Sequence, residues 1–261
     1  MNLGLEGKVV LITGGSKGIG LACARAFAAE GAKVAIASRS QDNLDRARDE
    51  LGKEGYKVAT IRADLSRAQD AGAMVAAVER ELGPVDVLVN SAGAAVRHTM
   101  DEYDEAAWHQ GMDAKYFPYV NSMDAVRGGM IERGRGAIVN LIGMGGKVAS
   151  PTHLAGGAAN AALMLVTTGM AHALGRKGIR LNTINPGSTF TDRVKQSLRV
   201  EAKVQGTSED EVLKRNQARI PLGRYGRPDE VAAVTLFLAS EQASYVTGAI
   251  ISMDGGRDPV I

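Results

Sequence analysis

A glycine-rich segment near the amino terminus has the residue types and spacing of a phosphate-binding turn. Thr13–Gly20 reads Thr-Gly-Gly-Ser-Lys-Gly-Ile-Gly, between an apolar run that predicts a strand and an alanine-rich run that predicts a helix. Gly14 permits a tight turn, Gly18 lets the backbone approach a pyrophosphate, and Gly20 allows close helix–strand packing. Because the helix amino terminus would face the phosphates, the segment predicts a dinucleotide site. Its expected contact residues are Gly14, Ser16, Lys17, Gly18, Ile19 and Gly20.

The next predicted strand, Lys33–Ala37, ends in cations where an acidic residue would hold the ribose of NAD. Ser38 and Arg39 follow the strand, and Lys17 lies in the glycine-rich turn. Arginine offers a planar fork and lysine a point charge, which together suit a 2′-phosphate. We therefore expect NADP(H) to be preferred over NAD(H), with Ser38 and Arg39 at that phosphate. The alternative is that both cations are only solvated surface charges.

Two further segments lie at the ends of predicted strands. Asp64-Leu65 follows the strand expected over Val58–Arg62, and Asn90-Ser91-Ala92-Gly93 ends the strand expected over Val85–Asn90. Open α/β sheets bind ligands in the crevice beyond the carboxyl ends of their strands. Asp64 and Leu65 are predicted at the adenine edge. Further cofactor contacts are predicted for Asn90, Ala92 and Gly93.

Short apolar runs alternate along the chain with alanine-rich helical segments, a pattern typical of βα units that build a buried parallel sheet. A helix is expected from about Ile19 to Glu30. The remaining strands are expected at Val9–Thr13, Ala137–Ile142, Ile179–Asn185 and Ala249–Met253. Seven strands predict one doubly wound, Rossmann-type α/β domain over residues 1–261. The polar, charged stretch 188–221 is the least regular and is predicted to be a mobile flap over the substrate site.

Composition restricts the expected partners and location. The chain has 261 residues, 45% hydrophobic and 23% charged, with a net charge of +2 and no basic stripe. Neither nucleic acid nor a membrane surface is expected as a partner, and no metal site is expected. The one cysteine, Cys23, cannot form an internal disulfide. No signal peptide and no membrane-spanning run is expected, so we predict a cytoplasmic protein that acts on a small molecule.

Taken in order, these motifs resemble those of the classical short-chain dehydrogenase/reductase family over nearly the whole chain. The other matching segments are Gly136–Asn140, Asn182–Gly187, Thr191-Asp192, Pro221–Arg224, Arg227–Ala232, Val246–Gly248 and Asp254–Gly256. The resemblance implies an oxidoreductase in which Pro186, Gly187 and Thr191 surround the nicotinamide. It also implies a tetramer that is built in part by the last strand.

The resemblance further implies four catalytic residues that this chain does not have. Family members usually carry an Asn on the fourth helix, a Ser after the fifth strand, and a Tyr-x-x-x-Lys pair on the next helix. The Tyr exchanges a proton with the substrate, and the Lys lowers the pKa of that Tyr and grips the ribose. The corresponding positions hold Lys115, Gly143, Gly156 and Asn160. Asn160 can still hydrogen-bond a ribose, but it carries no charge.

Lys115 and His153 are the predicted catalytic replacements. Lys115 lies on a helix expected to point into the crevice, and its ammonium can restore the charge of the missing lysine. Pro118, three residues on, predicts a kink there. His153 comes one turn before Gly156 and can titrate near neutrality. Each residue also has a plain alternative, a structural or surface role for Lys115 and a capping or surface role for His153. Further candidates are Tyr116, Tyr119 and His98, with core packing as the alternative for the two tyrosines.

Three functions remain open from the sequence. The first is an NADP(H)-dependent oxidoreductase of a small carbonyl or alcohol, with a relocated acid–base group. The second is a catalytically inactive NADP(H)-binding sensor, and the third is a non-redox lyase or isomerase. The small-residue run Ala155–Ala162 predicts a helix that packs closely against a second copy of the chain. A homodimer or homotetramer is therefore expected.

Overall fold

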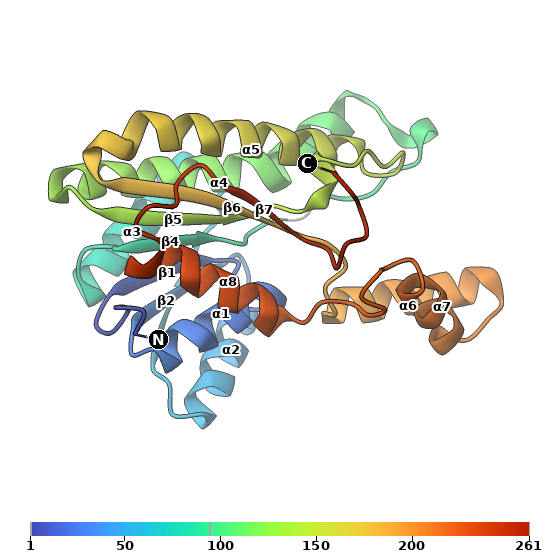
Figure 1. The fold of residues 1–261 in the computed structure, drawn as a ribbon, viewed down its shortest axis with the longest axis horizontal. Helices are drawn as coiled ribbons and strands as arrows, with labels where there is room; N and C mark the ends of the chain where they lie inside the picture. Colours follow the sequence, from blue (N-terminus) through green and yellow to red (C-terminus); the bar gives the residue numbers. More distant parts are fainter. Residues whose placement is uncertain (1, 94, 261) are drawn as a thin grey trace.

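A parallel sheet lies between two layers of helices in the computed structural model, which describes residues 2–93 and 95–260 (Figure 1). Its strands are β1 (Val9–Thr13), β2 (Lys33–Ser38), β3 (Val58–Arg62), β4 (Val87–Asn90), β5 (Gly136–Leu141), β6 (Ile179–Pro186) and β7 (Ile250–Met253). They follow the order β3-β2-β1-β4-β5-β6-β7, and every pairing is parallel. The predicted seven-stranded, doubly wound fold is confirmed. β4 begins two residues later than expected.

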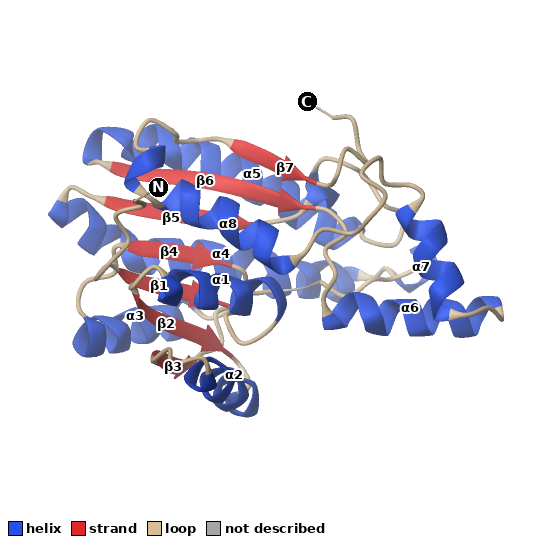
Figure 2. Cartoon of the chain, turned by 60° about the horizontal axis from the view of Figure 1, so that its bottom comes forward, coloured by secondary structure: helices blue, strands red, loops and turns tan. Residues whose placement is uncertain are grey.

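The helices divide between the two faces of the sheet. They are α1 (Gly18–Ala29), α2 (Gln41–Lys53), α3 (Ala68–Leu82), α4 (Glu105–Arg133), α5 (Leu154–Leu174), α6 (Asp192–Gln205), α7 (Glu209–Gln217) and α8 (Pro228–Ala239). On β1, Val9 and Leu11 join the core shared with α3, α4 and α5. Val10 and Ile12 join the core shared with α1, α2 and α8. Successive side chains of a strand point to opposite faces, so the apolar runs are buried on both sides. Figure 2 shows helices on both faces of the sheet.

Polar side chains tie the carboxyl ends of the central strands together. Thr13 Oγ1 donates to Asn90 Oδ1 at 3.1 Å, and Asn90 Nδ2 donates to Asn140 Oδ1 at 2.9 Å. Asn140 Nδ2 in turn donates to Thr167 Oγ1 of α5 at 2.9 Å. All four side chains are buried, so each needs the others as hydrogen-bond partners. The network fixes β1, β4, β5 and α5 at the edge where the strand order reverses and ligands bind.

Residues 188–221 are not the irregular stretch that their polar composition predicted. They contain α6 and α7, and Leu198, Ala202 and Val212 pack together in a small core of their own. Leu198 and Ala202 lie four residues apart and so share one helix face, although charged residues fill most other positions. Figures 1 and 2 show both helices projecting beyond the end of the sheet.

Helix α5 contradicts the expectation that no segment has the length and composition of a membrane span. Residues Leu154–Lys177 have a mean hydropathy of 1.3 and are long enough to cross a bilayer. In the fold, 44% of the apolar window is buried, and α5 lies along α4 and β6. The same test is passed by the core helix of a Rossmann-type domain, which is the place that α5 takes here.

Candidate functional site

The glycine-rich turn is built as the motif predicts. A Cβ on Gly20 would lie 2.3 Å from the carbonyl oxygen of Gly14, so only glycine permits this contact between helix and turn. Lys17 is the N-cap of α1, no side chain caps that helix, and its first turn contains no acidic residue. The first backbone N–H groups of α1 therefore form an anion site of the kind that holds a pyrophosphate. The Lys17 side chain is exposed beside it.

The end of β2 presents more positive charge than the sequence analysis found. Arg39 is exposed after the strand, and Arg62, the last residue of β3, donates from Nε to the Arg39 carbonyl at 3.2 Å. Arg62 was missed because it belongs to the strand pattern itself. A cavity of about 480 Å³ opens here, lined by Arg39, Ser66, Val96, Ala106, His109, Gln110, Asp113 and Ala114. A 2′-phosphate and an adenine fit the chemistry of this region.

Other predicted cofactor residues take different places around the crevice. Asp64 Oδ1 accepts from the backbone N–H of Ser66 at 3.2 Å and from its hydroxyl at 2.9 Å. Leu65 is buried, and its carbonyl accepts from Asn121 Nδ2 of α4 at 2.9 Å. The Asn90 side chain belongs to the buried network at the end of the sheet, so only its backbone and that of Ala92 and Gly93 can face a cofactor.

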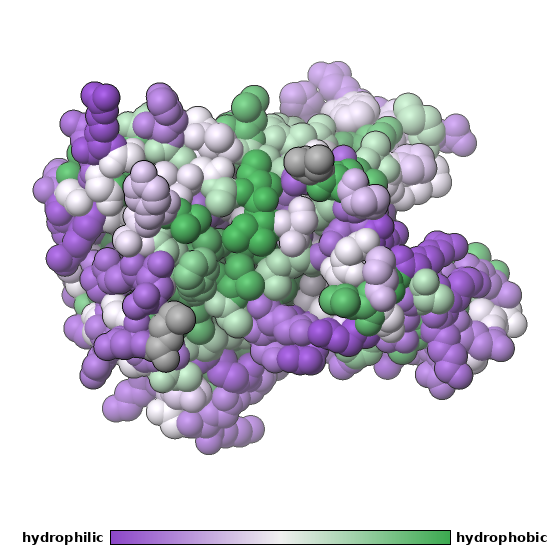
Figure 3. Space-filling model, viewed as in Figure 1, coloured by the Kyte–Doolittle hydropathy of each residue, from purple (hydrophilic) through white to green (hydrophobic). Residues whose placement is uncertain are grey.

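The residues expected around the nicotinamide lie opposite the glycine-rich turn. Pro186 ends β6, and the N–H of Gly187 donates to the Met253 carbonyl at 2.9 Å. Thr191 is the N-cap of α6, and its Cγ2 lies 3.5 Å from the Cβ position of Gly18. The fold thus brings Thr191 to the pyrophosphate turn across more than 170 intervening positions. The hollow at this end of the molecule, between α6–α7 and the rest of the domain, is visible in Figure 3.

Lys115 points into the protein rather than to solvent. Its side chain is 7% exposed, and Nζ donates to the Tyr119 hydroxyl at 2.8 Å and to the Leu141 carbonyl, at the end of β5, at 3.4 Å. The Tyr119 hydroxyl also donates to the Leu141 carbonyl, and burial raises the pKa of that hydroxyl. Lys115 is therefore anchored at the end of β5, two residues before Gly143. Its partner Tyr119, at i+4, was a further catalytic candidate in the sequence, but the buried hydroxyl instead holds Lys115 in place.

The predicted kink at Pro118 leaves α4 unbroken, since the helix runs from Glu105 to Arg133. Proline removes the N–H that would have bonded the carbonyl of Ala114. That carbonyl instead lies beside the crevice loop, 2.3 Å from the Cβ position of Gly93. The exposed backbone of α4 thus approaches the loop after β4.

The imidazole of His153 fills the space above Gly156. A Cβ on Gly156 would lie 2.1 Å from Cε1 and 2.6 Å from Nε2 of His153, so any side chain there would overlap the ring. His153 is the N-cap residue of α5, but its side chain makes no capping hydrogen bond. Its Nδ1 is buried and finds no hydrogen-bond partner among the described residues. Burial, then the charge of Arg97, then that of Lys115 lower the pKa of His153.

Asn160 lies one turn below Gly156 and faces the same space. It is 4% exposed, and its Nδ2 lies 3.4 Å from the Cβ position of Gly145, close to His153. Within the described part of the chain, Asn160 Oδ1 is buried without a hydrogen-bond partner. An orphaned buried acceptor is costly unless a ligand supplies a donor. A ribose hydroxyl supplies such a donor, so Asn160 fits a bound nicotinamide nucleotide.

Gly143 has a backbone conformation that favours glycine. Its φ is 125° and ψ is 154°, a region that residues with a side chain rarely adopt. Its N–H donates to Asn185 Oδ1 at 3.2 Å, which fixes the turn after β5. The backbone of a serine at this position would be strained, so this turn has a conformation that depends on glycine.

The wall of the site beside His153 contains the further candidate His98 together with Arg97 and Tyr103, which no sequence pattern indicated. Arg97 Nη1 donates to Thr152 Oγ1 at 3.2 Å, and the N–H of His98 donates to the Thr152 carbonyl at 3.2 Å. The Tyr103 hydroxyl accepts from the N–H of Ala155 at 3.2 Å. These contacts join residues about fifty positions apart, a pairing that one sequence does not reveal.

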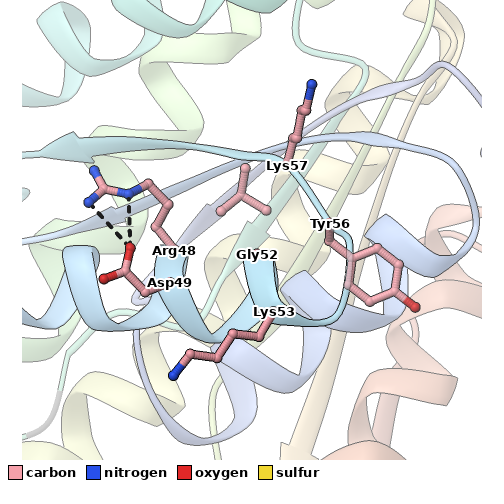
Figure 4. A pocket seen from close by; sticks show the side chains of 7 residues that line it. Arg48, Asp49, Gly52, Lys53, Tyr56 and Lys57 are labelled. Atoms are coloured by element: carbon pink, nitrogen blue, oxygen red, sulfur yellow. Dashed lines mark hydrogen bonds and ion pairs between the residues drawn. The ribbon is translucent and has the colours of Figure 1, made fainter.

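A second hollow, of about 500 Å³, lies between the end of α2 and the start of β3. Its lining includes Arg48, Lys53, Tyr56 and Lys57, whose side chains point away from one another (Figure 4). Arg48 is paired with Asp49 at 3.4 Å. Because no reactive groups converge, this hollow has no resemblance to an active site. It also lies at the amino end of β3, away from the carboxyl ends of the strands.

Comparison with known proteins gives relatives along the whole chain. A family model described as enoyl-(acyl carrier protein) reductase matches residues 14–258. The chain is 36% identical over 256 residues to 2-(S)-hydroxypropyl-CoM dehydrogenase 3 of Xanthobacter autotrophicus, spanning 98% of both chains. L-Sorbose reductase of Gluconobacter frateurii, solved with NADPH and L-sorbose, is similar with a TM-score of 0.93, 30% identity and 100% coverage of both chains.

A further similar structure comes from the same family of oxidoreductases. It is an NADPH-bound short-chain oxidoreductase from Pseudomonas aeruginosa, described as containing an atypical catalytic center. It has a TM-score of 0.87 and 33% identity, and the match covers 97% of this chain and 98% of that one.

Proposed function

Because the chain belongs to the short-chain dehydrogenase/reductase family, we propose that it is an NADP(H)-dependent oxidoreductase of a small carbonyl or alcohol with a non-standard acid–base set. The observation that carries this proposal is the position of His153, whose imidazole takes the space into which a side chain at position 156 would project. In the family, the catalytic tyrosine begins in that space. The imidazole of His153 thus takes the place of the tyrosine hydroxyl as the titratable group, although it comes from a different position in the chain.

His153 exchanges the proton of the reaction in this proposal. The chemistry that the nicotinamide supplies when bound is hydride transfer. In alcohol oxidation, neutral His153 accepts the hydroxyl proton at Nε2, and in carbonyl reduction the imidazolium returns it. Because the pKa of His153 is lowered, the ring is neutral at pH 7 and acts as a base. Alcohol oxidation is therefore the direction that neutral pH favours.

Lys115 supplies positive charge and Asn160 a hydrogen-bond acceptor. The ammonium of Lys115 stabilises the negative charge that develops on the substrate oxygen, because it lies near enough to lower the pKa of His153. Tyr119 and Leu141 hold the ammonium in place. Asn160 Oδ1 accepts from a ribose hydroxyl of the cofactor, a contact that the family lysine usually makes. The two tasks of that lysine are thus divided between two helices.

The cofactor preference for NADP(H) is part of the proposal. The preference is supported by exposed Lys17 in the glycine-rich turn and by Arg39 and Arg62, which follow or end the neighbouring strands β2 and β3. NADPH-bound relatives support this preference. Residues 188–221 are proposed to form the wall of the substrate site. We also propose that the protein is a homodimer or homotetramer located in the cytoplasm.

Exposed apolar side chains support the oligomer. Phe237 of α8 and Leu165 of α5 are 39% and 77% exposed, and all four residues of edge strand β7 are partly exposed. Figure 3 shows an apolar band over β7 and α8. Faces of this kind are usually covered by another protein surface. Light scattering of the purified protein tests whether it is a dimer or tetramer.

The test is a combined binding and turnover experiment. NADPH and NADH are titrated by cofactor fluorescence, and nicotinamide absorbance is followed with a panel of ketones, aldehydes and alcohols. The proposal expects NADPH-selective binding and a steady turnover that His153→Ala and Lys115→Ala reduce. His172→Ala and Lys177→Ala are matched controls, because His172 is exposed near the end of α5 and Lys177 is exposed in the turn that follows.

Two outcomes would favour the alternatives. Selective binding without turnover of any substrate would favour an NADP(H) sensor, which the lowered pKa of His153 supports, since a neutral imidazole is a poor acid for carbonyl reduction. Conversion of a substrate without any change in nicotinamide absorbance would favour a lyase or isomerase.

A further inference from the structure

His153 fills the space beside Gly156, and the basic side chains of Arg97 and Lys115, from two other elements, act on its charge. Lys115 comes from α4, His153 precedes α5, and Arg97 comes from the loop before α4. Arg97 and Lys115 are both close enough to act on the charge of His153. Positive charge therefore surrounds the proposed reaction site on more than one side.

Arg97 is held in position although its side chain is exposed. Its hydrogen bond to Thr152 Oγ1, at 3.2 Å, fixes it to the residue that precedes His153. The backbone of the neighbouring residue, His98, is bonded to the Thr152 carbonyl as well. The bond to Thr152 uses one of the five N–H donors of the guanidinium. Because the side chain is exposed, its remaining donors are open to a ligand.

Two acidic side chains of the segment between Arg97 and α4 have other tasks. Glu102 Oε2 accepts from the N–H of Thr99 at 2.7 Å and caps the short turn before α4. Asp104 Oδ1 accepts from the N–H of Ala107 at 2.7 Å and caps α4 itself. The two charges that act on His153 are both positive. The site therefore has a net positive field that a ligand can neutralise.

The buried polar atoms of the same space also point to a ligand. His153 Nδ1 and Asn160 Oδ1 are buried and, among the described residues, have no hydrogen-bond partner. The amino end of α5 adds its own partial positive charge, and no acidic residue lies in its first turn. A cluster of cations, a helix amino end and two orphaned polar atoms thus meet around one volume.

We propose that the substrate of this site carries a carboxylate or another compact anionic group, which Arg97 binds at the mouth while its carbonyl or alcohol carbon lies near His153 and Lys115. The inference rests on the proposed function, since it names the substrate class for that reaction. Small hydroxy acids and oxo acids have this chemistry. A neutral substrate of the same shape would leave the positive field without a counter-charge.

The anion also has an effect on the acid–base group. An opposite charge near an imidazole favours its protonated form. A bound carboxylate beside Arg97 would offset the two cations and raise the proton affinity of His153. The substrate would thereby prepare the imidazolium that carbonyl reduction requires, so that an anionic substrate is reduced faster than its neutral counterpart.

The experiment compares acids with their methyl esters on the NADP(H)-loaded protein. The probes are 2-oxobutanoate, 3-oxobutanoate and 4-oxopentanoate, which vary the spacing between carbonyl and carboxylate, each beside its ester. For at least one pair, kcat/KM for the acid is expected to exceed that for the ester. In Arg97→Ala this preference falls by about 10- to 100-fold, because a charged hydrogen bond is lost. Arg127→Ala, an exposed arginine of α4 paired with Asp124, is the matched control.

A second readout needs neither turnover nor a variant. The pKa of His153 is measured by NMR of the imidazole, with and without a bound acid. The acid used is the one with the highest kcat/KM relative to its ester, and every acid is tried if none of them turns over. The acid is expected to raise this pKa, and its ester is expected to leave it unchanged. Arg97→Ala should abolish most of the rise.

The outcomes separate this inference from the proposed function. Turnover with equal kcat/KM for every acid and its ester, and no shift of the His153 pKa, overturns the anionic substrate and leaves the oxidoreductase standing. No hydride transfer to any probe, together with an acid-dependent rise of that pKa, supports the anion site and overturns the oxidoreductase. An acid preference that Arg97→Ala does not change overturns the role of Arg97.

Discussion

Replacing Gly156 by alanine, a change of one methyl group, should remove the activity that depends on His153. The new Cβ would lie 2.1 Å from His153 Cε1, a distance at which the two atoms overlap. The imidazole is half-buried and can turn toward solvent, so it is expected to leave the site. An acid–base group in position is worth about 10²- to 10⁴-fold in rate. Gly156→Ala should therefore lose activity in that range.

The stability change should be small by comparison. Alanine in place of a helical glycine stabilises by up to about 1 kcal/mol, and an overpacked site costs about 1–3 kcal/mol if the ring stays. If the ring leaves, most of that cost disappears. Urea unfolding measures the free energy, and steady-state kinetics measure kcat/KM. The activity loss should then greatly exceed what a fall in the folded fraction would produce.

Two variants make the reasoning refutable. In His153→Ala, the added change Gly156→Ala should have no further effect on kcat/KM, because both act on the same ring. Gly169→Ala is the matched control on α5, since a Cβ there meets no atom within 4 Å. It should stabilise the protein by about 0.5–1 kcal/mol and keep its activity. Full activity in Gly156→Ala, or multiplied losses in the double variant, would refute the assigned role of His153.

Three other predictions concern charge and anchoring. Arg39→Ala should weaken NADPH binding by about 10- to 100-fold and leave NADH binding unchanged, measured by fluorescence titration, because the loss falls on the 2′-phosphate. The rate of alcohol oxidation should stay constant from high pH to below 6.5 and should fall only when the pH drops below the lowered pKa of His153, whereas the rate of carbonyl reduction should rise as the pH falls. Arg97→Ala removes a cation that lowers this pKa, so both pH–rate profiles should move to higher pH. Tyr119→Phe removes the hydroxyl that accepts from Lys115 Nζ, so thermal unfolding should show a loss of about 1–3 kcal/mol, and kcat should fall more than in Tyr116→Phe.

The sheet was predictable because its signals are local. Each strand is an apolar run of four to eight residues, and both faces of every central strand are buried, so the pattern needs no knowledge of the partner strand. The glycine-rich turn was predictable for the same reason. The helices of residues 188–221 were not, because charged side chains fill most of their surface and only Leu198, Ala202 and Val212 form their core.

The wall beside His153, to which we assign the reaction, was only half predictable. Lys115 and His153 stood out because they occupy or adjoin positions at which the family motif fails. Arg97 and Tyr103 did not, because their contacts with Thr152 and Ala155 join segments about fifty residues apart. The overlap between His153 and a side chain at position 156 depends on where the backbone places the ring. One sequence holds no measure of that distance.

The four changed positions are mutually dependent under the proposed function, so no single reversion should restore the usual family set. A serine at position 143 would have to adopt a φ of 125°, which is strained for any residue with a side chain. A tyrosine at position 156 would overlap the ring of His153. A lysine at position 160 would add a third cation beside an imidazole whose pKa two cations already lower. Each reversion conflicts with a group that the present site uses. Such conflicts are expected of an active site that has been rebuilt around new residues, but not of one that has only lost its catalytic residues.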